Sequence, residues 1–194
     1  MEIFDVRGGR IKKSELNKSI DILKKSGVIL YPTETSYALG CDAGNDKAKA
    51  RIFEIKGRSK NKELPLIAGS EVMVSRFCKV GMASAALMKQ FWPGPLTLVL
   101  DARRGKGSVA IRVPGWDLVR MLSNRLGRPI VSTSANLSGR ATCYSARAAL
   151  RQLGGRGIDL VLDAGRLPRR KPSTIIDDRG KKLRILRQGA VIIL

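Results

Sequence analysis

The sequence predicts an α/β fold, with an open, twisted, mixed β-sheet that carries helices on both of its faces. Segments rich in apolar and β-branched residues alternate along the chain with segments of helical periodicity, which is typical of this class. Hydrophobic residues make up 43% of the 194 residues, which is enough to form a core. No repeat, low-complexity tract or long linker interrupts the alternation. We therefore expect residues 1–194 to form a single domain.

Six segments have the apolar spacing and the end signals of helices. Ser14 can cap the first of them, and Asp117 can cap the fifth, which Gly127 ends. The string Trp-Pro-Gly-Pro at 92–95 cannot continue the fourth helix, and we expect Trp92 to pack on the core. The predicted helices are 14–26, 46–56, 71–78, 83–91, 117–126 and 145–153.

Short apolar and β-branched runs between these helices predict a mixed sheet of about six or seven strands. The runs at 97–100 and 109–113 are expected to pair with each other. The acidic pair 177–178 lies beside Gly180, which predicts a solvated turn rather than a catalytic pair of carboxylates. The strand-like segments are 28–31, 64–68, 97–100, 109–113, 130–133, 160–163, 174–177 and 183–186.

The composition excludes several kinds of chemistry. Histidine is absent, which excludes a Ser-His-Asp or Cys-His relay and a His-ligated metal. The three cysteines Cys41, Cys78 and Cys143 are odd in number and have no CxxC spacing, so we expect packing roles rather than disulfides or a zinc site. No apolar run approaches the ~18–20 residues of a membrane span, and the first residues do not resemble a signal peptide. A cytoplasmic location without membrane contact is the expectation.

The chain is strongly basic, with 37 Lys and Arg against 16 Asp and Glu and a formal charge of +21. Residues 101–194 hold 20 of these basic residues, 16 of them Arg, and only 6 of the acidic ones. Such a surface attracts polyanions, including RNA, at long range. A solubilising surface without a polyanion partner has the same composition, so both interpretations stay open.

Three polar segments have the residue types of a binding site. Residues 31–40, YPTETSYALG, place hydroxyls and a carboxylate directly after a buried strand. Residues 55–62, IKGRSKNK, place cations around a glycine at a helix end, where they can bind phosphate or complement the helix dipole. Residues 130–139, IVSTSANLSG, place small donors and acceptors after an apolar strand. Each segment taken alone is also explained as a turn or a helix cap.

Together these segments predict a concave site of hydroxyls and cations that suits an anionic ligand such as a nucleotide phosphate. The chain has no GxxxxGK[ST] loop and no GxGxxG fingerprint. Further strings extend the pattern: FWPGPLT (91–97), VAIRVP (109–114), PSTIID (172–177) and ILRQGA (185–190). With YPTETSYALG, KGR (56–58) and STSANLSG (132–139), their order and spacing resemble the YrdC-like threonylcarbamoyl-AMP synthases, in their short, single-domain form, over about residues 10–190.

The resemblance implies an enzyme of tRNA modification. Members of this family condense L-threonine, bicarbonate and ATP into threonylcarbamoyl-AMP and pyrophosphate. A separate threonylcarbamoyl-transferase complex then modifies the tRNA adenosine next to the anticodon. The resemblance also implies the YrdC-like fold, an open twisted sheet around a large, positively charged cavity.

The resemblance assigns site residues position by position. Lys56 and Arg58 match the two cations of the family's KxR motif and are the expected catalytic residues. Ile67 falls where some relatives have a His near the threonine, which is a departure from the family pattern. The expected ATP-binding residues are Arg58, Lys62, Ser108, Ser134, Asn136, Thr142 and Arg187. The expected L-threonine-binding residues are Thr35, Ile67, Arg112, Ser132 and Ser173.

The chemistry of that reaction suits a chain without histidine. The N-carboxylate of threonine and the α-phosphate are both anionic, so cations and positioning lower the barrier. Mg²⁺ is expected to arrive with ATP, because the sequence shows no cage of metal ligands. An alternative is a non-catalytic module of the same fold that binds tRNA or other double-stranded RNA, which the charge favours. Aromatic residues are only 5% of the chain, which disfavours a surface that stacks bases.

Overall fold

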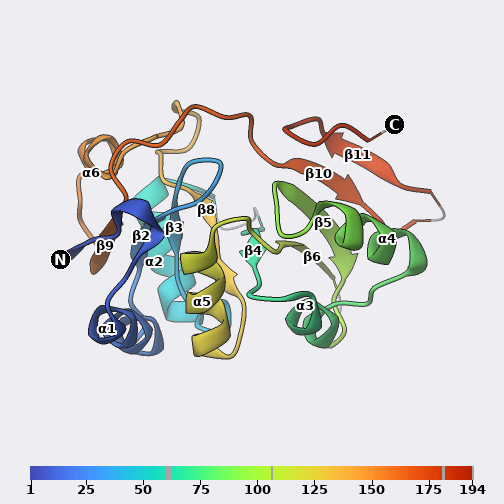
Figure 1. Cartoon of the computed structure of the whole chain (residues 1–194), viewed down its shortest axis with the longest axis horizontal. Helices are drawn as coiled ribbons and strands as arrows, with labels where there is room; N and C mark the ends of the chain where they lie inside the picture. The colour runs from blue at the N-terminus through green and yellow to red at the C-terminus, as the bar shows by residue number, and fades with distance from the viewer. Residues whose placement is uncertain (60–62, 106, 181, 194) are drawn as a thin grey trace.

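The strands of the computed structural model divide into two mixed sheets that lie next to each other (Figure 1). The model describes residues 1–59, 63–105, 107–180 and 182–193. The predicted α/β class is confirmed, whereas the prediction of one sheet of six or seven strands is wrong. Short strands at the junction of the two sheets account for the difference.

The first sheet contains both parallel and antiparallel neighbours. Its central strands are buried on both faces, which explains their nearly continuous apolar sequences. The N-terminal strand lies at one edge. Counted from that edge, the third strand pairs with the second in parallel orientation and with the fourth in antiparallel orientation. The spatial order is β1 (Glu2–Asp5), β9 (Leu160–Asp163), β2 (Ile29–Pro32), β3 (Tyr37–Gly40) and β8 (Thr133–Ser134).

The second sheet holds the remaining six strands. The two segments that the sequence predicts to pair form its centre and run antiparallel. The spatial order is β11 (Arg184–Arg187), β10 (Thr174–Asp177), β5 (Leu96–Asp101), β6 (Ser108–Arg112), β4 (Leu66–Ile67) and β7 (Ile130–Val131).

Three connections join the sheets, and the first of them leads from β3 to β4. The predicted strand 130–133 is two short strands, because β7 pairs with β4 in the second sheet while β8 pairs with β3 in the first. The break falls at Ser132, whose N–H donates to the carbonyl of Pro65. The third connection is the extended segment 164–173, which runs from β9 across the molecule to β10 (Figure 1). These crossings bring residues distant in sequence to the space between the sheets.

The described part of the chain has six α-helices, and each overlaps a predicted one. Helix α2 begins and ends at the predicted residues, capped by the Asn45 side chain, which accepts from the Ala48 N–H at 3.0 Å. Ser14 and Asp117 are not caps, because the helices begin after Lys12 and Trp116. The helices are α1 (Lys13–Lys24), α2 (Asp46–Lys56), α3 (Glu71–Phe77), α4 (Met82–Phe91), α5 (Asp117–Leu126) and α6 (Ala146–Leu153).

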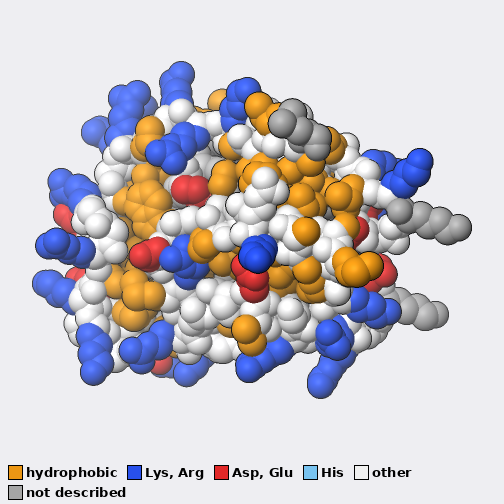
Figure 2. All heavy atoms as spheres, turned by 45° about the vertical axis from the view of Figure 1, so that its right-hand side comes forward, with side chains coloured by type: hydrophobic (Ala, Val, Ile, Leu, Met, Phe, Trp, Pro, Cys, Tyr) orange, Lys and Arg blue, Asp and Glu red, His pale blue; other side chains and the backbone are white. Residues whose placement is uncertain are grey.

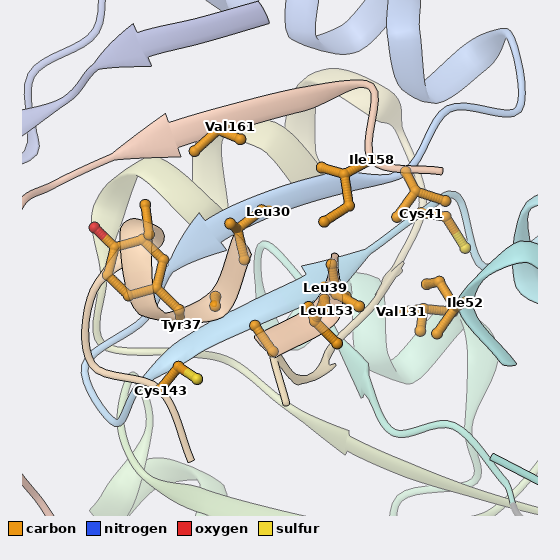
Figure 3. Packing of buried hydrophobic residues seen from close by; sticks show 14 of the residues in the cluster. Leu30, Tyr37, Leu39, Cys41, Ile52, Val131, Cys143, Leu153, Ile158 and Val161 are labelled. Atoms are coloured by element: carbon orange, nitrogen blue, oxygen red, sulfur yellow. The ribbon is translucent and has the colours of Figure 1, made fainter. Parts of the chain in front are cut away.

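Helices cover both faces of the first sheet. Ile29 and Tyr31 of β2 face a core formed with α1 and α5, whereas Leu30 faces a core formed with α2 and α6. Figure 3 shows the second of these cores, in which Leu30, Tyr37 and neighbouring apolar side chains gather on one side of the strands. The alternation follows from the two-residue period of a strand. The prediction of helices on both faces is correct for this sheet.

The second sheet is covered by helices on one face. Leu96, Leu98 and Ile111 pack against α3 and α4, and Trp92 is buried in the same core, as predicted. The opposite face presents alternate residues such as Thr97 and Arg112 to the space between the sheets. This uncovered face is therefore available to form a wall of a site.

Several remaining predictions concern buried or surface residues. Cys41, Cys78 and Cys143 are buried free thiols, as predicted. Asp177 is not in a solvated turn: it is buried at the end of β10 and paired with Arg179 and Arg184. None of the helices in the described ranges is long and apolar enough to cross a membrane.

Candidate active site

A cavity of about 480 Å³ lies between the two sheets. One wall is the uncovered face of the second sheet, and the other comes from the β2–β3 turn, from β3 and β8, and from the loop that follows β8. Nine of the thirteen predicted site residues line this cavity: Thr35, Arg58, Ile67, Arg112, Ser132, Ser134, Thr142, Ser173 and Arg187. The fold thus brings together residues separated by up to 152 positions in the sequence.

The turn between β2 and β3 is fixed by its own hydroxyl groups. The Thr33 hydroxyl donates to the Ser36 carbonyl at 2.7 Å and accepts from the N–H groups of Thr35 and Ser36 at 3.2 Å. The hydroxyls of Thr33 and Thr35 are 3.0 Å apart. The turn interpretation of this segment is therefore correct, and the same bonds hold Thr35 at the cavity wall.

An ion pair connects this turn to the second sheet. The guanidinium of Arg112, at the end of β6, donates through Nη1 to Glu34 Oε1 and through Nη2 to the Thr35 hydroxyl at 3.4 Å. The two side chains are only 9% and 12% exposed. Arg112 thus reaches the cavity as a buried cation whose partner comes from the other sheet.

A second cation is held at the opposite edge of the second sheet, on the exposed strand β11. Arg187 on β11 donates to the carbonyl of Ser173 at 3.0 and 2.8 Å and to its hydroxyl at 3.0 Å. Thr97 on β5 donates to the same hydroxyl at 2.9 Å. Burial, and then the nearby Arg112, lower the pKa of Arg187 from its ordinary value. The two guanidinium groups therefore form a basic centre suited to an anion.

Arg58 follows the end of α2. Gly57 has a φ of 55°, and an added Cβ would meet no heavy atom within 4 Å, so this glycine ends the helix rather than making room for a ligand. Arg58 donates through Nη2 to the Glu63 carbonyl at 2.9 Å. Its Nε is buried without a hydrogen-bond partner among the described residues. Arg58 thus brings an unused donor to the cavity lining.

Lys56, an expected catalytic residue, is not among the residues that line the cavity. Its ammonium is buried and donates to the carbonyls of Ser134 and Asn136, the latter at 2.7 Å. The Lys56 carbonyl accepts from the Ser138 N–H at 3.0 Å. Burial, with a smaller effect from Arg58, lowers the pKa of Lys56 to about 8. Lys56 therefore supports the loop that carries Ser134.

Asn136 also stabilises this loop from outside the cavity. Its side-chain amide donates at 2.8 Å to the carbonyls of Leu137 and Arg140. Its Oδ1 is buried with no hydrogen-bond partner in the described parts of the chain. Asn136 thus shapes the loop and is not among the residues that line the cavity.

Ser108 lines a neighbouring cavity of about 500 Å³ between α2 and β6. It lies four residues from Arg112, which is about 13 Å along an extended strand. The two cavities share Glu63, Leu66 and Ala110 in their walls. The expected ATP contact of Ser108 would therefore require a ligand that extends past these shared residues. Lys62, the remaining predicted site residue, lies outside the described residues.

Seven further lining residues carry polar side chains that the residue-by-residue prediction does not include: Thr33, Ser36, Glu63, Thr97, Thr133, Tyr144 and Arg170. Thr33 and Thr97 lie within the recognised strings, so the sequence could have identified them as candidate site residues. Tyr144 lies outside these strings. Arg170 comes from the connecting segment, which is anchored where the Leu167 N–H donates to the Tyr144 carbonyl at 2.7 Å.

The described lining is rich in positive charge. Arg58, Arg112, Arg170 and Arg187 contribute to it, against the single carboxylate of Glu63. No group of three or more potential metal-ligating side chains occurs in the described ranges. The donor set is thus suited to phosphate and carboxylate groups rather than to a bare cation.

Comparison with known proteins identifies the family. The family model Sua5_yciO_yrdC, described as telomere recombination, matches residues 21–189. A threonylcarbamoyl-AMP synthase of Vibrio cholerae is 37% identical over 185 residues, covering 90% of this chain and 97% of the relative.

Two solved structures have similar folds. P. abyssi Sua5 complexed with L-threonine has a TM-score of 0.90 and 31% identity, covering 97% of this chain and 58% of that one. This chain therefore spans little more than half of the archaeal protein. E. coli YciO has a TM-score of 0.86 and 27% identity, covering 97% and 96% of the two chains. With a family model that matches most of its length and a curated relative of similar size, the chain belongs to the Sua5/YciO/YrdC family.

Proposed function

We propose that this protein is a threonylcarbamoyl-AMP synthase that joins L-threonine, bicarbonate and ATP, with release of pyrophosphate. The observation that carries the proposal is the convergence of nine predicted site residues from both sheets on one cavity. Two relatives support the proposal: the Vibrio cholerae protein is named threonylcarbamoyl-AMP synthase, and P. abyssi Sua5 forms a complex with L-threonine.

The cavity residues divide into two groups according to the expected ligands. Arg58, Arg187 and the hydroxyls of Ser134 and Thr142 are assigned to ATP. Arg112, with the hydroxyls of Thr35, Ser132 and Ser173, is assigned to L-threonine. Ile67 adds a buried apolar surface on the amino-acid side.

This assignment suggests catalysis by positioning and electrostatics. The threonine amine and bicarbonate form an N-carboxylate with loss of water, and one of its oxygens attacks the α-phosphate as pyrophosphate leaves. Arginines at the cavity wall reduce the repulsion between these anions and orient them for attack. Mg²⁺ belongs to this scheme as part of the MgATP substrate, because Glu63 is the one carboxylate in the described lining.

The test is a reaction with ATP, bicarbonate and L-threonine, with detection of the adenylate by mass spectrometry. Pyrophosphate release should require all three substrates, and each omission is an internal control. Arg187→Ala should reduce the rate by about tenfold or more, because a charge-assisted contact to a phosphate is lost. Exposed Arg151 on α6 provides a matched control, and Arg151→Ala should leave the rate unchanged. Pyrophosphate release without threonine would contradict the proposal.

RNA contact is a second proposal, carried by charge. Residues 118–158 contain seven Arg and no acidic residue. Figure 2 shows Lys and Arg side chains around the edge of one face, with hydrophobic side chains gathered nearer its middle. Binding of tRNA at physiological salt, measured by filter retention, would support RNA contact. Binding without any adenylate formation would favour the non-catalytic module instead.

A further inference from the structure

We propose that Glu34 is a positioning residue that orients Arg112 toward the carboxylate of the amino-acid substrate. The inference rests on the proposed function, which assigns that carboxylate to Arg112. It adds a residue that acts through another side chain, because Glu34 is not itself part of the cavity lining.

The rigidity of the β2–β3 turn makes Glu34 a fixed support. Glu34 lies within the turn that Thr33 holds with hydrogen bonds to Thr35 and Ser36. Its carboxylate is enclosed further by Gly115, where a Cβ would lie 3.7 to 3.9 Å from the Glu34 Cγ and Cδ atoms. A carboxylate held in this way restricts the guanidinium that it binds.

The guanidinium of Arg112 is held on one side only. Its Nη1 and Nη2 donate to Glu34 and Thr35, and within the described residues no protein acceptor is bonded to its Nε. Since Arg112 also lines the cavity, donors that Glu34 does not use remain available to a ligand. The planar fork of arginine binds a carboxylate well only when its orientation is correct.

The environment of Arg112 makes this support necessary. Thr35 contributes only a 3.4 Å contact, so the Glu34 carboxylate is the stronger of the two partners. Arg187 lies close enough for Arg112 to affect it, and like charges in one cavity repel each other. Without Glu34, we expect the Arg112 side chain to leave its place at the wall and to bind carboxylates less well.

Glu34 can either orient Arg112 or compete with the substrate for it, and these two roles predict opposite results when Glu34 is removed. If Glu34 merely occupied a substrate site on Arg112, its removal would tighten threonine binding. If Glu34 orients Arg112, its removal weakens threonine binding, and an uncharged acceptor at position 34 restores it. Glu34→Gln keeps the Oε1 acceptor that Arg112 uses and removes the charge, so it separates the two effects.

The experiment compares the full-length wild-type protein with Glu34→Ala and Glu34→Gln. Glu34→Ala should raise both the KM for L-threonine and its calorimetric Kd by about tenfold or more. The KM for ATP should change by less than about threefold, and Glu34→Gln should lie within about threefold of wild type in every constant. Asp159→Asn is the matched control, because it alters the ion pair between Arg51 on α2 and Asp159, the residue before β9, and neither residue lines the cavity.

Several results would overturn the inference. Unchanged or tighter threonine binding by Glu34→Ala would do so, as would equal weakening of threonine and ATP. A Glu34→Gln protein as impaired as Glu34→Ala would exclude orientation through the hydrogen bond. If wild type forms the adenylate and Glu34→Ala behaves as wild type, only this inference fails. If wild type neither binds nor consumes L-threonine, the proposed function fails together with it.

Discussion

Replacement of Lys56 by Met should loosen the loop beside the cavity and weaken ATP binding. Methionine keeps the length of the side chain and removes its donors. In the wild-type protein the ammonium binds two carbonyls of the loop, those of Ser134 and Asn136, and both it and Asn136 are buried. Ser134 lines the cavity, so a shift of this loop displaces a hydroxyl assigned to ATP.

The expected magnitude follows from the two carbonyl groups. A buried acceptor that loses its donor costs about 1–3 kcal/mol. Two such acceptors predict a decrease of about 2–4 kcal/mol in the free energy of unfolding, after part of the loss is offset because a buried charge is also removed. For a protein of ordinary stability this is a large fraction of the total.

The measurement is urea unfolding of Lys56→Met, combined with ATP binding by calorimetry under conditions where the variant is folded. Lys47→Met is the matched control, because Lys47 is an exposed cation on the same helix. The control should change the unfolding free energy by less than about 0.5 kcal/mol. Wild-type stability of Lys56→Met would refute the assigned role, and so would lost ATP binding without any loss of stability.

Three further predictions follow from the same geometry. Arg58→Ala should weaken ATP binding by about tenfold without the stability loss of Lys56→Met, because Arg58 lines the cavity; calorimetry and urea unfolding would separate the two variants. The pKa of Lys56 is about 8, below its ordinary value of 10.5, so between these pH values the unfolded chain binds more protons than the folded one. The stability of the wild type relative to Lys56→Met should therefore increase as the pH rises from about 8 to 10.5, and a difference that does not change with pH would contradict this. Hydrogen bonds from Arg179 lower the pKa of Asp177 to about 2, so Asp177→Asn should cost about 1–2 kcal/mol at pH 7, and this difference should disappear as the pH falls from about 4 to 2.

Most elements of the fold could be predicted because their signals are local. Periodicity and turn residues identified all six helices and the β5–β6 pair. Two strands were missed for different reasons. β1 lies at the edge of its sheet and is only partly buried, so its sequence is not a continuous apolar run. β3 is a short apolar strand that directly follows a polar turn, so in the sequence the two together resemble one polar segment. The division into two sheets depends on long-range pairing at Ser132, which no local pattern reports.

The candidate site could be predicted in part, because the recognised strings contain most of the residues that line the cavity. They do not distinguish a residue that faces the cavity from one that supports it. Lys56 and Arg58 are two positions apart on one string, yet one binds backbone carbonyls and the other lies at the wall. Tyr144 and Arg170 depend on how the connecting segment crosses between the sheets, and that path is not encoded in any short motif.

The charge of the site is lower than the number of its predicted cations suggests. Lys56 is bound to carbonyls behind the wall, and Arg112 is paired with Glu34, so neither provides a full free charge to the cavity. Arg58, Arg170 and Arg187 have no carboxylate partner in the described residues, which leaves them as the main attraction for phosphate groups. In the proposed reaction, a site in which every cation was free would hold the pyrophosphate product more tightly and would slow its release. Internal pairing of part of the charge allows the cavity to orient its anions while still releasing them.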